Sequence, residues 1–187
     1  LILRGAGSLD SRQLTATLDN LGLQRGESVG VQHLGFSGAT VADRLPDALA
    51  VYSDILQNPH LPADQFEASR DGLSMTLEAM HDEPRQRLMV ELRRHCFPAP
   101  WGTPTYGRLE QLKNISSDSI TAHYHQLVRP NAAILGVAGG VDPAAVIDVV
   151  ERSFGSWEPS PEPIPETLEH SPTNRHIDHE STQTHIG

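Results

Sequence analysis

The segment His-Ile-Asp-His-Glu at residues 176–180 contains the residue types that bind zinc in hydrolytic enzymes. Imidazole nitrogens and carboxylates hold such an ion, and the ion activates a bound water for attack on a peptide bond. The spacing here is His-x-x-His-Glu, and residues 176–186 alternate weakly between apolar and polar types, which predicts a strand. Residues three apart in a strand face opposite sides, so His176 and His179 would diverge. We therefore expect an ordinary polar strand end here and no metal site.

The other reactive side chains also have simple structural explanations. His123 and His125 are two residues apart on a predicted helix, where such neighbours do not share a face. The string His-Asp-Glu at 81–83 precedes Pro84 at a helix junction and is expected to be a polar helix end. Cys96 is the only cysteine, so no internal disulfide or cysteine-based zinc cluster can form, and we expect it to be a small buried residue. We expect no serine triad.

The overall charge and hydropathy exclude further classes of protein. The 187 residues include 14 Lys and Arg against 24 Asp and Glu, for a net charge of −10 at pH 7. Affinity for phosphates depends on Lys and Arg, so we expect no nucleic-acid partner. No apolar run is long enough to cross a bilayer. The chain opens without a start methionine or a signal peptide, so Leu1 is expected to be a cut point, and both the cytoplasm and the periplasm suit a soluble chain of this kind.

The spacing of apolar residues predicts a chain dominated by helices. Leu14, Leu18 and Leu21 mark one helix, which Ser11 caps and Gly22 ends. The loop at 98–107 carries Trp101 and Tyr106, which we expect to pack over a neighbouring element, or else to line the wall of a chamber. Further helices are expected at about 43–56, 63–83, 84–96, 108–112, 116–127 and 143–154, with strand-like segments at 23–38 and a buried strand at 132–138 that ends at two glycines.

Several strings in this order resemble the insulinase, pitrilysin and mitochondrial-processing-peptidase family of zinc metallopeptidases. They include Leu-Arg-Gly-Ala-Gly-Ser at 3–8, Ile-Leu-Gln-Asn-Pro at 55–59 and Trp-Gly-Thr-Pro-Thr-Tyr-Gly at 101–107. The longest is Arg-Pro-Asn-Ala-Ala-Ile-Leu-Gly-Val-Ala-Gly-Gly-Val-Asp at 129–142. The resemblance covers residues 1–157 and implies an α+β fold, a mostly antiparallel sheet with helices packed on one face.

The resemblance also implies which residues a zinc site would need. The family binds zinc through His-x-x-Glu-His on a helix, where the Glu is the general base, and through a third ligand, a Glu, on a later helix. The first motif would precede Leu1 and is absent from this chain. The third-ligand position falls at Met75 or Thr76, and neither supplies a carboxylate. Glu78, one turn from Met75, is the substitute if the register slips, although a solvated surface acid explains it better.

The resemblance therefore implies a degenerate, non-catalytic domain without a cofactor of its own, whereas active relatives use zinc. Such a domain pairs with a second homologous domain or subunit, as in a dimer, and helps to form a chamber that holds a peptide substrate. Two alternatives remain: an active zinc endopeptidase whose ligand helix lies outside this chain, and a purely structural subunit. We expect a truncated peptidase-like domain at 1–157, a linker rich in Pro and Glu at 158–174, and a strand at 175–187.

Overall fold

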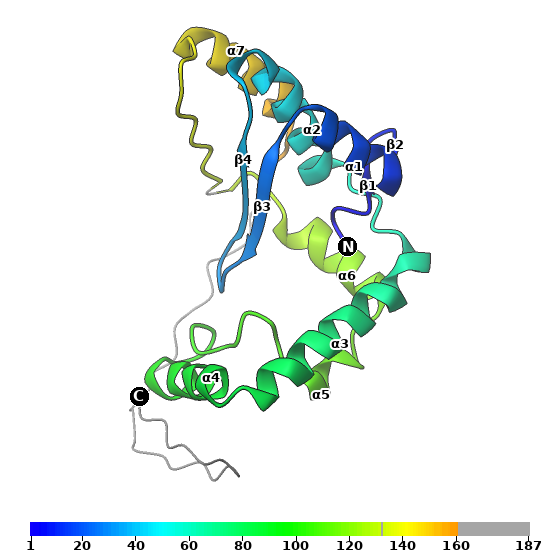
Figure 1. The fold of residues 1–187 in the computed structure, drawn as a ribbon, viewed down its shortest axis with the longest axis vertical. Helices are drawn as coiled ribbons and strands as arrows, with labels where there is room; N and C mark the ends of the chain where they lie inside the picture. Colours follow the sequence, from blue (N-terminus) through cyan, green and yellow to red (C-terminus); the bar gives the residue numbers. More distant parts are fainter. Residues whose placement is uncertain (132, 161–187) are drawn as a thin grey trace. The chain divides into compact units, whose positions relative to one another are not determined.

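The computed structural model confirms an α+β fold with antiparallel strands (Figure 1). It describes residues 1–131 and 133–160, so the segment 176–180, the predicted strand at 175–187 and most of the predicted linker lie outside the described residues. The strands form two small sheets, β1 with β2 and β3 with β4. The elements are β1 (Gly5–Ala6), β2 (Leu9–Asp10), α1 (Ser11–Asn20), β3 (Gln24–Val29), β4 (Leu34–Ala39), α2 (Leu45–Gln57), α3 (Phe66–Asp82), α4 (Pro84–Cys96), α5 (Leu109–Leu112), α6 (Ser117–Leu127) and α7 (Pro143–Phe154), with short 3₁₀ turns at Ala42–Arg44 and Ala63–Gln65.

The chain divides into two compact units. Among the described residues, the first unit comprises 1–27, 36–67, 116–131 and 133–160, and it holds α1, α2, α6 and α7 together with the small sheet of β1 and β2. The second unit comprises the described residues 28–35 and 68–115, and it includes most of α3 with α4 and α5. Within the described residues, no helix has the length and hydropathy to cross a membrane.

Helix α1 supplies much of the apolar core of the first unit. Leu14 and Leu18 are buried on one face, as their spacing predicts, and pack in a cluster with Ala6, Leu23, Ala48 and Ile55. The expectation that Ser11 caps this helix is wrong. Asp10 is the N-cap, because its carboxylate accepts from the backbone N–H of Gln13 at 2.8 Å while the Gln13 side chain accepts from the Asp10 N–H at 3.0 Å.

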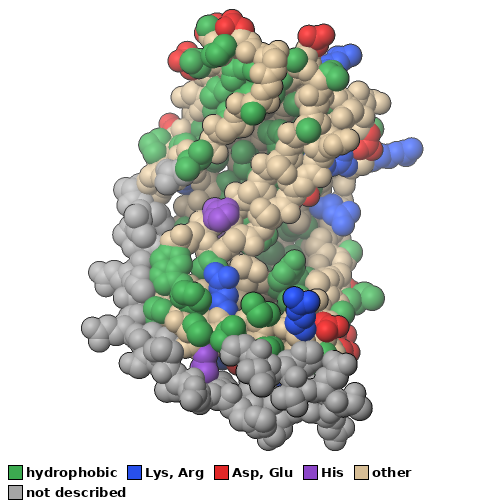
Figure 2. Space-filling model, turned by 60° about the vertical axis from the view of Figure 1, so that its left-hand side comes forward, with side chains coloured by type: hydrophobic (Ala, Val, Ile, Leu, Met, Phe, Trp, Pro, Cys, Tyr) green, Lys and Arg blue, Asp and Glu red, His purple; other side chains and the backbone are tan. Residues whose placement is uncertain are grey.

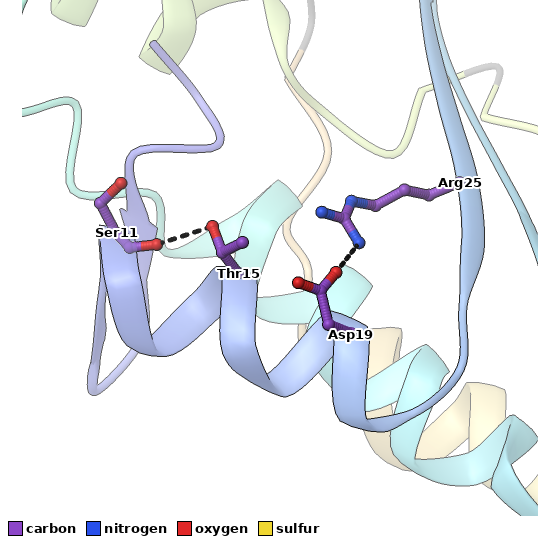
Figure 3. A network of polar contacts seen from close by, with 4 residues as sticks. All are labelled: Ser11, Thr15, Asp19 and Arg25. Carbon is purple, nitrogen blue, oxygen red and sulfur yellow. Dashed lines mark hydrogen bonds and ion pairs between the residues drawn. The ribbon is translucent and has the colours of Figure 1, made fainter.

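An ion pair joins the end of α1 to strand β3 (Figure 3). The Arg25 guanidinium of β3 lies 2.8 Å from the Asp19 carboxylate of α1. Within α1, the Thr15 hydroxyl donates to the Ser11 carbonyl at 3.0 Å. Gly22 follows the helix with a φ of 61°, a left-handed conformation that glycine adopts without strain. The chain can therefore reverse direction directly after α1 and enter β3.

Two sets of hydrogen bonds fix α2 against later helices of the first unit. The hydroxyl of buried Ser53 donates to the Ser153 carbonyl at 2.6 Å, and the Gln57 amide donates to the same carbonyl at 2.8 Å, which ties α2 to α7. The buried Tyr124 of α6 donates its hydroxyl to the Leu56 carbonyl at 2.8 Å. These bonds use carbonyls near the ends of α2 and α7, where helices lack internal partners.

The prediction of a buried strand at 132–138 is wrong for the described part of that run. Residues 133–138 have no regular secondary structure and lie outside both sheets, and Ile134 is 96% exposed. Composition predicted a buried strand, but pairing requires a neighbouring strand that none of the described residues supplies. Figure 2 shows hydrophobic side chains reaching the molecular surface at many points.

The expectation that Cys96 is buried is also wrong, because this residue is exposed. Cys96 is the last residue of α4, and the preceding turn carries Arg93, Arg94 and His95. Basic side chains favour the C-terminal end of a helix, where they complement the helix dipole. Residue type alone predicted burial, but Cys96 lies at the exposed C-terminal end of a helix in which no residue is buried.

Candidate functional site

The candidate site is the face of α3 that carries Met75 and Thr76, the positions that the resemblance assigns to the third zinc ligand. Opposite this face, α3 half-buries Leu73 and Leu77. Met75 is 71% exposed, so α3 has apolar side chains on both sides. A helix that is apolar on both faces normally has a partner on each of them. This second apolar face is therefore the part of α3 available for binding.

A hollow of about 570 Å³ lies over this face, within the second unit. Its walls come from α3, from the start of α4 and from the loop that follows α4. Met75, Ala79 and Glu83 are four residues apart along one line, so successive turns of the chain contribute to the same wall. The full lining is Met75, Thr76, Ala79, Met80, Glu83, Gln86 and Tyr106.

The polar atoms near the hollow do not form a zinc site. The Thr76 hydroxyl donates to the Gly72 carbonyl at 3.0 Å, as threonine often does inside a helix. Glu78 does not line the hollow, and its carboxylate instead accepts from the Ser74 hydroxyl at 3.4 Å. The donor set therefore does not fit zinc, which needs three protein ligands chosen from His, Cys, Asp and Glu at a catalytic site.

The other predicted candidates are not brought together into a site either. His123 and His125 are both exposed on α6, and the buried Tyr124 lies between them in sequence. The string at 81–83 lies where α3 ends and α4 begins, as predicted. Among the residues that the structure describes, no group of three or more His, Cys, Asp and Glu is arranged to hold a metal ion.

The two aromatic residues of the loop at 98–107 behave differently from each other. Trp101 is half-buried, and its carbonyl accepts from the Arg93 guanidinium at 3.0 Å. Tyr106 is 55% exposed and lines the hollow, so it is not covered by a neighbouring element as Trp101 partly is. The sequence signal for Tyr106 was its place in a loop rich in Pro and Gly, where large aromatic residues have few neighbours.

One motif escaped the sequence reasoning. Residues 26–30 read Gly-Glu-Ser-Val-Gly, which has the Gly-x-Ser-x-Gly pattern of serine hydrolases. That chemistry requires the serine at a sharp turn between a strand and a helix. Ser28 instead lies inside β3, and a turn closed by the hydrogen bond from Gly30 N–H to the His33 carbonyl leads on to β4. The motif therefore belongs to a hairpin and does not provide a nucleophile.

Two tyrosines of the first unit have perturbed acidity. Burial raises the pKa of Tyr124 above its ordinary value, and the Arg129 charge opposes this rise. Burial also raises the pKa of Tyr52, with a further rise from Glu27 and an opposing effect of Arg25. Both hydroxyls donate to backbone carbonyls, Tyr124 to Leu56 and Tyr52 to Ser37. Their roles are structural, because each hydroxyl holds one part of the first unit against another.

Comparisons with known proteins agree with the fold. Residues 114–187 match the family model described as Peptidase M16 inactive domain. The chain is 21% identical over 165 residues to the mitochondrial-processing peptidase subunit beta of Lentinula edodes, which covers 88% of this chain and 35% of that protein. It is 20% identical over 159 residues to the uncharacterized zinc protease YmxG of Bacillus subtilis, which covers 84% of this chain and 39% of that protein. A solved structure described as peptidase M16 inactive domain, from Pseudomonas fluorescens, matches with a TM-score of 0.77 at 13% identity, over 91% of this chain and 42% of that chain.

These findings confirm the predicted resemblance in both sequence and fold. The chain spans well under half the length of each of these proteins. Two of the relatives are named as a processing peptidase and a zinc protease, whereas the family model that matches here describes an inactive domain.

Proposed function

We propose that this chain, whose residues 114–187 match the family model of the M16 peptidase inactive domain, binds peptide substrate without cutting it and pairs with a second peptidase-type half. The observation that carries this proposal is the composition of the α3 face. Thioether, methyl and aromatic groups of Met75, Thr76 and Tyr106 line the hollow, and the resemblance assigns the third zinc ligand to one of the first two positions. Such groups hold apolar side chains but do not activate water.

The apolar segment at 133–138 supports the pairing part of the proposal. It lies outside both sheets and its side chains are exposed, including Leu135 at 51% and Val137 at 39%. An apolar segment outside a sheet can pair with an incoming strand. A strand from a second half would cover these side chains and satisfy the backbone groups at the same time.

The test is a binding and cleavage assay with an unstructured fluorescent peptide. We expect fluorescence anisotropy to report binding and mass spectrometry to find the peptide intact, with or without added zinc. Zinc-dependent cleavage would overturn the proposal in favour of an active endopeptidase. A folded chain that neither binds nor cuts would overturn it in favour of a purely structural subunit.

Glu78 provides the sharpest internal check on the zinc alternative. If its carboxylate were a ligand, Glu78→Gln would abolish zinc binding and any zinc-dependent cleavage. We expect Glu78→Gln to leave both the zinc content and the peptide binding unchanged, because the carboxylate lies outside the hollow and contacts Ser74. Equilibrium dialysis with zinc, followed by metal analysis, measures this directly.

A further inference from the structure

A second hollow, of about 240 Å³, lies between the starts of α2 and α7, and we call it the α2–α7 hollow. We propose that it binds a linear aliphatic diamine, with one ammonium group against Asp43 and the other against Asp142. All of its lining belongs to the first unit, so the inference does not rest on the proposed function. The lining is Ala42, Asp43, Leu45, Pro46, Leu49, Gly140, Val141, Asp142, Ala145, Val146 and Val149.

The two helices supply matching halves of an apolar wall. Leu45 and Leu49 of α2 are four residues apart and share one helical face. Val146 and Val149 of α7 are three residues apart and share a face in the same way. Leu49 is 5% exposed, and the other three are half-buried. A chain of methylene groups laid along these side chains would therefore cover apolar surface.

The wall is formed before any ligand arrives. Helix α2 packs directly against α7 (Figure 1). Towards the end of α2, Ser53 and Gln57 both donate hydrogen bonds to the Ser153 carbonyl of α7. Little ordering of the protein then opposes binding. The hollow is smaller than the sites that hold drug-sized ligands, so it suits a short chain.

Two carboxylates give the hollow its charge, and among the described residues the lining has no Lys, Arg or His. Asp43 is exposed, and within the described part of the chain it makes no ion pair. The neighbouring Arg44 guanidinium instead pairs with Asp47 at 3.5 Å. Asp142 caps α7 by accepting from the Ala144 N–H at 3.3 Å, and its second oxygen can still accept from an ammonium group.

The placement of these charges favours a ligand with two cations over a ligand with one. One carboxylate comes from the turn before α2 and the other from the N-cap of α7, with the aliphatic side chains of both helices lining the same hollow. A helix start carries about half a positive charge, so a full carboxylate charge still leaves each position negative. A diamine places a cation at each carboxylate and its methylene chain on the apolar wall.

The assay uses the whole chain with isotope-labelled leucine and valine methyl groups. The probe 1,4-diaminobutane is titrated to about 10 mM, which is tenfold above a dissociation constant of about 1 mM. We expect the methyl signals of Leu45 and Val146 to shift, and those of Leu14, which is 1% exposed in the core of the same unit, to stay in place. Sodium chloride at the same ionic strength should shift none of these signals.

Two related ligands separate the charges from the apolar chain. Butylamine has the same chain with one ammonium group and should bind about threefold more weakly, as expected for the loss of one exposed ion pair. The probe 1,2-diaminoethane keeps both ammonium groups and has two methylene groups fewer, so it should bind about fourfold more weakly on a half-buried wall.

Matched variants test the lining itself. Asp142→Asn should weaken binding about threefold and keep the cap on α7, because Asn is also a good N-cap residue. Asp148→Asn, a change of the same charge on α7 outside the lining, should have no effect. Ala145→Leu fills part of the hollow and should weaken binding at least about tenfold, whereas Ala144→Leu, exposed and outside the lining, should leave binding unchanged.

The inference stands if the shifts, the ligand order and the variant order are all as stated. No shift at Leu45 and Val146, in a chain that is folded by circular dichroism, would overturn it. Equal shifts with sodium chloride, or equal binding of butylamine and the diamine, would also overturn it, because the two carboxylates would then not each hold an ammonium group. An equal loss from Asp142→Asn and Asp148→Asn would show only the general negative charge of the chain, and it too would overturn the site.

Discussion

The hydrogen bond between α6 and α2 gives a prediction whose size follows from the structure. Tyr124 is only 8% exposed, and its hydroxyl donates to the Leu56 carbonyl at 2.8 Å. Tyr124→Phe keeps the ring and removes the donor, which leaves a carbonyl near the end of α2 without that partner. One such bond contributes about 1 kcal/mol net. For a chain of this length, we expect the midpoint of thermal unfolding to fall by about 2–4 °C.

The other two tyrosines provide matched controls for the same chemical change. Tyr52 is half-buried and donates to the Ser37 carbonyl at 2.9 Å, so Tyr52→Phe should lower the free energy of unfolding by a smaller amount. Tyr106 is 55% exposed, so Tyr106→Phe should change the free energy of unfolding by less than about 0.5 kcal/mol. Urea unfolding followed by circular dichroism gives the three values under the same conditions.

The predicted order is that Tyr124→Phe destabilises most, Tyr52→Phe less and Tyr106→Phe least. An equal loss from Tyr124→Phe and Tyr106→Phe would refute the reasoning, because the buried bond would then add nothing beyond the ring. A larger loss from Tyr52→Phe than from Tyr124→Phe would refute the claim that burial sets the value of each bond.

Three further predictions test the first unit. Asp10→Ala should lower the free energy of unfolding in urea by about 1 kcal/mol, because the cap on α1 is lost, whereas Ser11→Ala should lower it little. The reverse order would identify Ser11 as the cap. Leu14→Ala should cost about 3 kcal/mol because Leu14 is 1% exposed, whereas Ile147→Ala, at 56% exposed, should cost far less. Burial raises the pKa of Tyr124 above its ordinary 10.0, so the unfolded state loses this proton first as the pH rises. The free energy of unfolding should therefore be unaffected by this group below pH 10.0 and fall above it. Tyr124→Phe should remove part of that fall in unfolding curves measured at different pH.

The helices were predictable because their signal is local. Leu14 and Leu18 lie on one face at helical spacing, and the structure buries both in the core of the first unit. The helix predicted at about 43–56 is α2, which buries Leu49 and Ile55. The cap was not predictable from residue type alone, because Asp and Ser are both good N-cap residues. The backbone conformation decides between them, and it is extended at Asp10.

The sheet was not predictable in the same way, because pairing depends on partners far along the chain or on another chain. Residues 133–138 have the composition of a buried strand, yet the described residues offer them no neighbour. The hollow was also missed as a site. The sequence identified Met75 only as a position without a carboxylate. Gln86 and Tyr106 line the same hollow only because the tertiary structure brings them to it.

The position that the resemblance assigns to a zinc ligand is therefore also a wall of the proposed binding site, and this has a physical consequence. A carboxylate at Met75 would add a charge beside Ala79, Met80 and the Tyr106 ring and would remove apolar surface from this wall. A thioether at the same place adds apolar surface that a peptide side chain can cover. Met75 thus contributes apolar surface to the hollow. On this reasoning, Met75→Gln should weaken binding of the unstructured fluorescent peptide, whereas Met89→Gln, an exposed change outside the hollow, should leave binding unchanged.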